Sequence, residues 1–228
     1  MGFQTQVNAQ QAPACAGDFA SANPRAATVS PEGGFVAGAA GVTVGRFAWI
    51  QSDGVTVLNT GTGKPDGFIH REQQALISTY LAESGNLIPV GFPVTLMRTG
   101  DYYALANGSA AAKGEKAYAK FQDGSARFEP TASAPASASI TAAQSGTTLT
   151  VSAVGSGALS VGDLVKQASG TPAYITAQLT GTAGSTGTYT LSVSQTVSSG
   201  AATATSYIET DFACAGACAS GELAVMSL

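Results

Sequence analysis

The stretch IETDFACAGACASGELAVMSL, residues 208–228, indicates how the rest of the chain is organised. Its acidic residues and its mixture of large and small apolar side chains resemble the composition of residues 41–132. The segment directly before it differs, because residues 140–205 contain one acidic residue, Asp163, and one basic residue, Lys166. We therefore infer that the tail completes the sheet of a first domain and that the segment between them is an insertion.

The inserted segment has the pattern of a small all-β domain. The stretches TTLTVSAV and GTYTLSVSQTV alternate apolar or β-branched residues with small polar ones, and glycine-rich turns separate such runs. Period-two alternation over short runs predicts strands, and about 65 residues of this kind predict a small sandwich or barrel. The preceding TASAPASAS, residues 131–139, has the composition of a linker. We expect an inserted glycine- and threonine-rich domain at residues 133–206.

Residues 41–132 also predict short strands and tight turns. VTVGRFAWIQS alternates large and small residues, with a slip at Gly45 that is typical of a β-bulge. Hairpin turns are expected at Asp53-Gly54, Asn107-Gly108 and Asp123-Gly124. The predicted fold class is therefore all-β. It has a discontinuous β-barrel or sandwich domain, residues 41–132 plus 207–228, and a second small β-sandwich-like domain inserted near the C-terminus.

Residues 1–40 lack a lasting hydrophobic period. They carry three prolines together with several glycines and alanines. A loop this long without secondary structure is normally functional or disordered. We expect an extended N-terminal arm that becomes ordered against a partner, and a tail without fixed structure is the alternative.

The composition argues against several classes of partner. The net charge is −4, and the ten lysines and arginines are scattered singly, whereas nucleic-acid binding uses clustered basic residues. No run of about 18 apolar residues predicts a membrane span, and the start MGFQTQVNAQQ lacks the features of a signal peptide. An odd number of cysteines, three, argues for a reducing cytoplasm. We expect no nucleic-acid partner and no membrane partner.

The sequence offers little for catalysis. His70 is the only histidine, and no G-x-S-x-G motif occurs. Cys214 and Cys218 lack the basic neighbours that would lower a thiol pKa and the second ligand pair of a zinc site. We interpret both as small loop residues, and we expect no catalytic residue, no metal and no cofactor. A glycan hydrolase would need paired carboxylates, and the inserted segment has only Asp163, so we predict that the chain is not an enzyme.

The densest polar cluster is His70-Arg71-Glu72, followed by Gln73 and Gln74. Arginine pairs with carboxylates in a bidentate fork, and the glutamines add further donors and acceptors. A contact between subunits and a solvated turn are both compatible with this cluster.

Several long stretches resemble the structural cement protein family of tailed bacteriophages, the Gp24-like capsid decoration proteins. They are GDFASANPR (residues 17–25), GVTVGRFAW (41–49) and HREQQALI…YLAE (70–83), with the tail from Ile208 similar to that family's C-terminal segment. The resemblance covers about residues 1–128 and 208–228. The inserted segment departs from the family's short form and looks like a glycine- and threonine-rich β module of phage structural proteins.

The resemblance implies a role without catalysis. Family members bind the outside of a mature head built from a major capsid protein of the HK97-type fold, and they clamp neighbouring capsomers against the pressure of packaged DNA. It implies synthesis in the host bacterial cytoplasm, location on the outer surface of the virion capsid, and contacts between neighbouring cement subunits. We expect a homotrimer, with a homodimer as the alternative. The candidate capsid or intersubunit contacts are Phe3, Phe19, Asn23, Pro24, Arg25, His70, Arg71, Glu72, Gln73 and Gln74.

A phage tail or adhesin-type protein is the alternative function. In that case the inserted domain would bind host surface glycans, with Tyr174, Tyr189 and Tyr207 exposed for stacking on sugars. On the capsid, the inserted domain would project outward.

Overall fold

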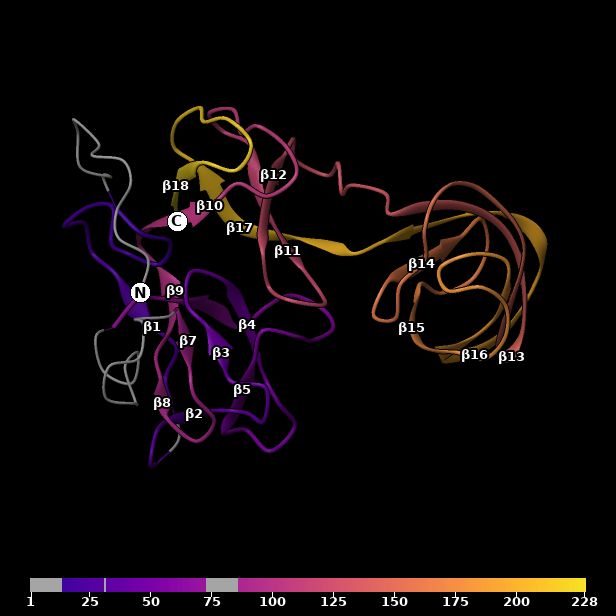
Figure 1. The fold of residues 1–228 in the computed structure, drawn as a ribbon, viewed down its shortest axis with the longest axis horizontal. Helices are drawn as coiled ribbons and strands as arrows, with labels where there is room; N and C mark the ends of the chain where they lie inside the picture. The colour runs from indigo at the N-terminus through magenta and orange to yellow at the C-terminus, as the bar shows by residue number, and fades with distance from the viewer. Residues whose placement is uncertain (1–13, 31, 73–85) are drawn as a thin grey trace, which may run out of the picture.

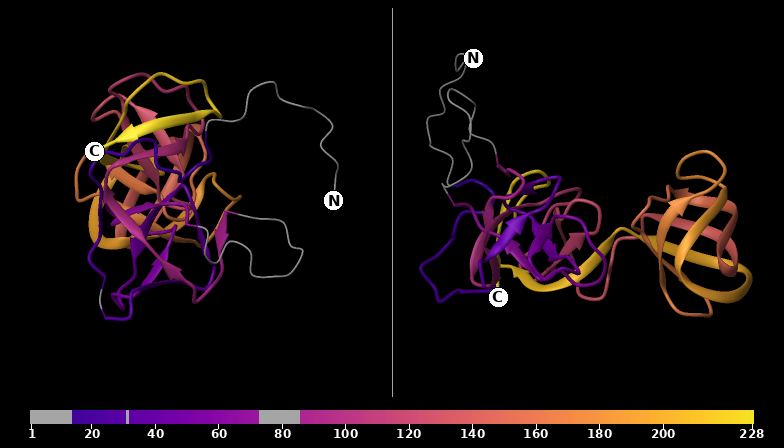
Figure 2. Two further views of the ribbon diagram at one scale, coloured as in Figure 1. Left: turned by 90° about the vertical axis from the view of Figure 1, so that its left-hand side faces the viewer. Right: turned by 90° about the horizontal axis from the view of Figure 1, so that it is seen from below.

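The computed structural model describes residues 14–30, 32–72 and 86–228, and these ranges form strands, turns and loops without a helix (Figure 1). The predicted all-β class is confirmed. Figures 1 and 2 show a larger part, which we call the body, and a four-stranded sheet that stands apart from it, which we call the projecting sheet.

The strands form three larger sheets and one ribbon. The seven-stranded sheet has the order β1 (Ala26–Ala27), β9 (Leu96–Thr99), β6 (Gly67–Ile69), β4 (Phe47–Ile50), β5 (Thr56–Leu58), β2 (Phe35–Ala37) and β8 (Pro93–Val94). The five-stranded sheet has the order β10 (Asp101–Leu105), β18 (Leu223–Ser227), β17 (Tyr207–Cys214), β11 (Lys116–Lys120) and β12 (Ala126–Glu129). The projecting sheet has the order β13 (Ala138–Gly157), β16 (Gly187–Thr205), β14 (Leu164–Gln167) and β15 (Ala173–Gln178). A ribbon pairs β3 (Val42–Thr43) with β7 (Leu87–Ile88).

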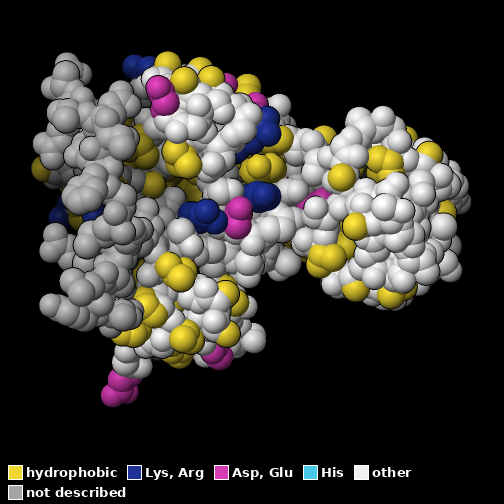
Figure 3. All heavy atoms as spheres, in the orientation of Figure 1, with side chains coloured by type: hydrophobic (Ala, Val, Ile, Leu, Met, Phe, Trp, Pro, Cys, Tyr) yellow, Lys and Arg dark blue, Asp and Glu magenta, His cyan; other side chains and the backbone are white. Residues whose placement is uncertain are grey.

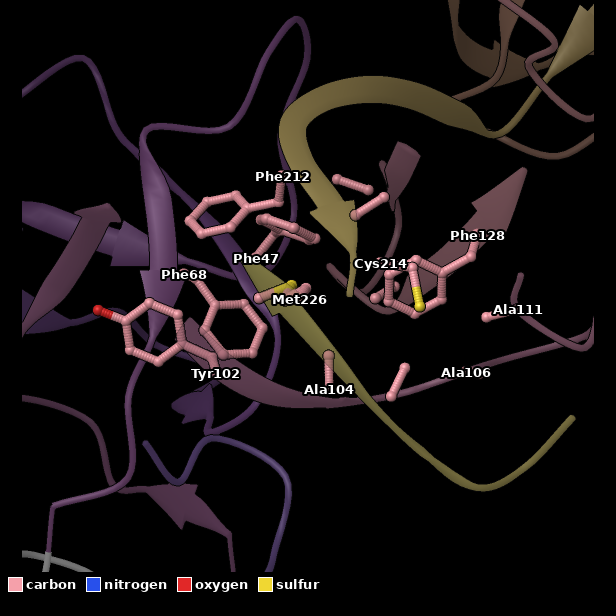
Figure 4. Packing of buried hydrophobic residues seen from close by; sticks show 14 of the residues in the cluster. Phe47, Phe68, Tyr102, Ala104, Ala106, Ala111, Phe128, Phe212, Cys214 and Met226 are labelled. Atoms are coloured by element: carbon pink, nitrogen blue, oxygen red, sulfur yellow. The ribbon is translucent and has the colours of Figure 1, made fainter. Parts of the chain in front are cut away.

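The two large sheets of the body pack face to face. Because successive side chains of a strand point to opposite faces, Phe47 and Trp49 of β4 enter the core shared with the five-stranded sheet, whereas Ala48 enters a second core. Figure 4 shows the aromatic centre of the shared core, where Phe212 and Met226 meet rings from the other sheet. Its ring contacts include Phe47–Phe212 at 6.0 Å between centroids. The body is therefore a sandwich.

The second core lies on the other face of the seven-stranded sheet. It contains Phe35 of β2, Val57 of β5 and Leu96 of β9, all buried. The edge strand β8 runs through the single residue Thr95 into β9, which lies beside the opposite edge, so the sheet is curled. The strand orders of both large sheets are open rather than cyclic. Of the two predicted architectures, the body is therefore a sandwich and not a barrel.

The last two strands lie inside the five-stranded sheet. β18 pairs antiparallel with β10, from Asp101 opposite Ser227 to Leu105 opposite Leu223, and β17 pairs with β11. The hairpin expected at Asn107-Gly108 is therefore wrong, because β18 and β17 lie between β10 and β11. The hairpins at Asp53-Gly54 and Asp123-Gly124 are confirmed, since β4 pairs with β5 and β11 pairs with β12.

Two local expectations are corrected. The stretch around Gly45 is not one bulged strand, because β3 and β4 belong to different sheets and a turn with φ of 75° at Gly45 separates them. Cys214 is not a loop residue, because it ends β17 with its side chain buried in the shared core, whereas Cys218 lies in the following loop. The small thiol fills space in this core as an apolar group would.

Part of the predicted arm, residues 1–40, is integrated into the body. β1 pairs with β9, and β2 lies between β5 and β8 in the seven-stranded sheet. Phe35 and Ala37 of β2 are buried in the second core, which ties this segment to the body through the hydrophobic effect. Residues 1–13 lie outside the described residues, so an arm there stays a prediction.

The projecting sheet has a core of its own. Thirteen buried residues, among them Ile140, Leu149, Ile175 and Tyr189, form one cluster from its four strands and the loop that holds Leu159. The long strands β13 and β16 pair antiparallel, and the hairpin β14–β15 pairs with two separate parts of β16. Figure 3 shows almost no charged side chains on its visible face, in contrast to the body.

The tail strand β18 contributes directly to the stability of the sandwich. We expect Met226→Ala, at a fully buried side chain, to lower the free energy of unfolding by about 2–5 kcal/mol, because it leaves a cavity in the shared core. Val225→Ala, on the half-buried opposite face of the same strand, is the control and should cost about 1 kcal/mol or less. Urea unfolding measures both. Equal losses for the two variants would contradict this placement of the tail.

Candidate interaction site

The first of the predicted contact segments lies along the outer edge of β10. The Gly17 N–H donates to the Tyr103 carbonyl at 2.7 Å, and the Tyr103 N–H donates to the Asp18 carbonyl at 3.0 Å. The Ala20 N–H donates to the Asp101 carbonyl at 2.9 Å, and Phe19 forms a β-bridge with Tyr102. Residues 17–20, which we call the edge segment, thus cover the edge of the five-stranded sheet.

Glycine allows the edge segment to lie this close to the body. Gly17 has a φ of 93°, and a Cβ there would lie 2.5 Å from the Val44 side chain. Gly45 has a φ of 75°, and a Cβ there would lie 2.6 Å from the Ala16 Cβ. Left-handed backbone at these two positions favours glycine, and a larger residue at either would separate the edge segment from the turn at Gly45.

The Phe19 ring is the centre of the cluster. It stacks on the His70 ring with centroids 4.1 Å apart and an interplanar angle of 26°. The Arg25 guanidinium carbon lies 3.7 Å from the same ring centroid. Both groups cannot occupy one ring face at these distances, so Phe19 lies between the imidazole and the guanidinium. Cation–π contacts of this kind are worth about 0.5–1 kcal/mol at exposed sites.

Charged groups hold the second segment to the first. The Arg71 N–H donates to the Gly17 carbonyl at 2.8 Å, and the Arg71 guanidinium lies 3.4 Å from the Asp18 carboxylate. His70 Nε2 lies 3.8 Å from the Glu72 carboxylate. Burial lowers the pKa of His70 below its ordinary value, and this effect outweighs the opposing charge of Glu72. The imidazole is therefore held neutral in the folded protein near pH 7.

Asp101, at the start of β10, ties down the next part of the chain. Its carboxylate accepts hydrogen bonds from the Ser21 hydroxyl at 2.5 Å and from the Asn23 amide at 2.6 Å. The hydrogen bond from Ser21, followed by one from Ser227, lowers the pKa of the Asp101 carboxyl. Residues from the N-terminal and C-terminal parts of the sequence therefore share this central carboxylate.

The structure thus brings most of the predicted contact residues into one cluster. Phe19, His70, Arg71 and Glu72 form its half-buried base, and Asn23, Pro24 and Arg25 form its exposed surface. Phe3, Gln73 and Gln74 lie outside the described residues. The arrangement can act as a firmly held protein-contact surface with an exposed cation and an exposed amide.

Sequence reasoning missed Asp18, Ser21 and Asp101, which hold the cluster together. Asp18 and Ser21 lie in GDFASANPR, so the dense polar pattern of that stretch was their available signal. Asp101 gave no such signal, because it follows a glycine in an ordinary turn position, and its partners Ser21 and Asn23 are 80 and 78 residues away in the sequence.

A groove of about 810 Å³ lies between the body and the projecting sheet. Among its lining residues, Asp66 is the one acid and Lys64 the one base. The Asp66 carboxylate already accepts the Ile50 N–H at 2.8 Å. This lining lacks the pair of carboxylates that glycoside hydrolysis uses.

The tyrosines expected to stack on sugars are not exposed, which corrects that expectation. Tyr189 is 1% exposed in the core of the projecting sheet. Tyr174 packs against Phe121 of the body, and the half-buried Tyr207 lies below the Arg127 guanidinium. These rings therefore contribute to packing within the protein and are not presented for stacking on a ligand.

The cysteines and possible metal ligands form no further site in the described ranges. Burial raises the pKa of the Cys214 thiol, which disfavours the reactive thiolate. Within residues 14–30, 32–72 and 86–228, no group of three or more His, Cys, Asp or Glu side chains could hold a metal ion. The same ranges contain no helix long and apolar enough to cross a membrane.

An all-β sandwich does not by itself define a function, so the class of protein comes from comparison with known families. The family model of the XM1 gp53 minor capsid protein matches residues 3–162. This range includes both segments of the cluster and most of the chain, so the protein belongs to this family of phage minor capsid proteins. No curated protein matches the chain.

The family gives the protein a structural role associated with the phage capsid, and a location in the virion. The match ends at Gly162, within the projecting sheet, so it includes β13 but not β14 to β18. It names a minor capsid protein and not the Gp24-like cement proteins, so the finer resemblance remains a hypothesis.

The half-buried histidine predicts a pH-dependent stability. The folded pKa of His70 lies below the ordinary value of 6.5, so the unfolded chain takes up a proton first as the pH falls. The contribution of His70 to the free energy of unfolding is therefore fully present above pH 6.5, and it is lost as the pH decreases through the folded pKa. We expect urea unfolding at pH 8, 6.5 and 5 to show this loss in the wild type and a smaller loss in His70→Gln. No second histidine exists to mask the effect, and an identical pH dependence in both proteins would refute it.

Proposed function

We propose that the protein decorates the outside of the mature phage head and clamps neighbouring capsomers of a major capsid protein with the HK97-type fold. The observation that carries this proposal is the position of the contact cluster. Its exposed residues lead into β1, which lies at the end of the body remote from the projecting sheet (Figures 1 and 2). One end of the molecule is thus available for the capsid while the other stands free.

The physical properties of the cluster suit such a contact. Arginine is enriched among the residues that dominate interface energies, and Arg25 is exposed while its guanidinium is positioned by Phe19. A hydrogen bond to Asp101 positions Asn23 before any partner binds. Preorganisation of this kind reduces the entropy lost on binding.

Assembly with other copies would strengthen the clamp. A symmetric homotrimer, or alternatively a homodimer, would place several identical clusters against the capsid lattice at once. Linked contacts raise the avidity by orders of magnitude without stronger individual contacts. Residues 1–13 would extend each contact as an arm.

We also propose that residues 133–206 are an inserted domain that projects outward from the capsid. Its separate hydrophobic core and the two chain crossings that connect it to the body support this division. The remaining body, residues 41–132 and 207–228 together with the integrated part of residues 14–40, would carry capsid binding.

Reversal of one exposed charge tests the contact surface. We expect Arg25→Glu to weaken binding to undecorated capsids of the source phage by roughly tenfold or more, since hot-spot arginines contribute about 2 kcal/mol or more. Cosedimentation with capsids measures the affinity.

Lys166→Glu is the matched control, because it reverses an exposed charge on the projecting sheet and should leave capsid binding unchanged. Thermal unfolding must show that both variants are folded. Wild-type affinity in folded Arg25→Glu would exclude this surface as the capsid contact.

Removal of the projecting sheet tests the division into domains. Glu129 and Tyr207 pair with opposite ends of β11, about 17 Å apart by strand geometry. A Gly-Ser linker of about six residues reaches roughly 20 Å and can replace residues 133–206. We expect a folded, capsid-binding body that is destabilised by about 1–2 kcal/mol, because Phe121 loses the cover of Tyr174. Circular dichroism and cosedimentation measure the outcome, and an unfolded product would mean that the two parts share one core.

A further inference from the structure

The contact between the body and the projecting sheet is built around one buried carboxylate. Asp163 is the only acidic residue between residues 140 and 205, and it is 0% exposed. It lies in the turn directly before β14. A buried charge is costly unless hydrogen bonds compensate for its lost hydration, so its partners indicate why the position is acidic.

Four donors converge on Asp163. One carboxylate oxygen accepts the Gln122 amide at 2.9 Å and the Ser206 hydroxyl at 2.6 Å. The other accepts the Ser137 hydroxyl at 3.0 Å and the Ser160 N–H at 2.9 Å. Ser137 directly precedes β13, and Ser206 is the single residue between β16 and β17. Asp163 therefore holds both chain crossings and, through Gln122, the body itself.

Further contacts surround this carboxylate. The Gly63 N–H of the body donates to the Tyr174 hydroxyl at 2.9 Å, and the Tyr174 ring packs edge-on against Phe121 with centroids 5.3 Å apart. The Phe121 N–H donates to the Ser206 carbonyl at 2.9 Å. Tyr174 and Leu164 both pack against the shared core of the body, so the projecting sheet and the body meet through apolar as well as polar groups.

The incoming chain crossing is also held in place. The Ala132 N–H donates to the Glu209 carboxylate at 2.6 Å, and the Ser133 N–H donates to the Tyr118 hydroxyl at 3.0 Å. Ala132 has a φ of 60°, the one left-handed residue other than glycine in the described ranges. Such a conformation persists where the surroundings enforce it. The Thr205 hydroxyl donates to the Pro135 carbonyl at 2.7 Å, which joins the two crossings.

We infer that the body and the projecting sheet form one rigid unit, and that Asp163 is the positioning residue that fixes the angle between them. Domains joined by a small interface usually move relative to each other. Here motion would break the hydrogen bond from Gln122 of the body to the buried Asp163 and the one from Gly63 of the body to Tyr174, and a buried group left unsatisfied is costly. The inference of a rigid unit depends on these contacts alone. Only its consequence, a projecting sheet held at a constant angle to the capsid, rests on the proposed function.

Nitrogen-15 relaxation of the free full-length protein tests the rigid unit. We expect amides of both parts of the wild type to report one common rotational correlation time. The double variant Gln122→Ala/Tyr174→Phe removes body-to-sheet hydrogen bonds and leaves the core of the projecting sheet intact. In that variant we expect the correlation time of the projecting sheet to fall below that of the body. Asp163→Asn should change in the same direction.

Gln51→Ala is the matched control, because Gln51 lines the same groove but its amide donates within the body, to the Trp49 carbonyl. It should retain the common correlation time. Amide spectra show whether each part stays folded, and the double variant remains informative if Asp163→Asn unfolds the projecting sheet. Two separate correlation times in the wild type, or an unchanged common value in the folded double variant, would overturn the inference. Failure to bind capsids would leave these measurements untouched and would count against the proposed function only.

Discussion

The pairing of β18 with β10 is the constraint on which the rest of the body depends. Five consecutive residue pairs join strands that are more than a hundred residues apart in the sequence. This pairing places Met226 beside the aromatic side chains of the shared core, and it leaves only the outer edge of β10 for the edge segment. Without β18, β10 would lose its link to β17 and β11, and the face that buries Phe47 and Phe68 would be incomplete. The free energy gained by closing this long-range pair must therefore exceed a large loss of chain entropy.

The pairing of β12 and β17 with β11 explains why the chain can carry a second unit so near its C-terminus. β12 and β17 flank β11 in the five-stranded sheet, so the chain leaves the sheet after Glu129 and returns to it at Tyr207. Both positions are anchored by strand pairing on the body side. The projecting sheet therefore needs no contribution from the body to form its hydrophobic core, whereas its orientation depends on the few side chains at the crossings.

Much of the local structure could be predicted from the sequence, because turns and alternation are local properties. Asp53-Gly54 and Asp123-Gly124 form hairpins since the strands on either side are true neighbours. Asn107-Gly108 has the same chemistry but joins strands that the tail strands separate, and no local signal shows this. The candidate contacts at Phe19 and His70 came from separate stretches. Their stacking required the edge segment to pair with β10, a contact that depends on the whole sheet and could not be predicted from either stretch.

The amino-acid composition predicts the neutral surface of the projecting sheet, but it does not predict the role of Asp163. The scarcity of charge in residues 140–205 describes the surface of the projecting sheet, where many exposed residues are serines and threonines. The one acidic side chain is absent from that surface because it is the point where the chain enters, leaves and contacts the body. A serine at each crossing and a glutamine on the body are ordinary residues in the sequence. Their common acceptor gives them a shared role, and the single acid of this neutral segment marks the joint between the two parts.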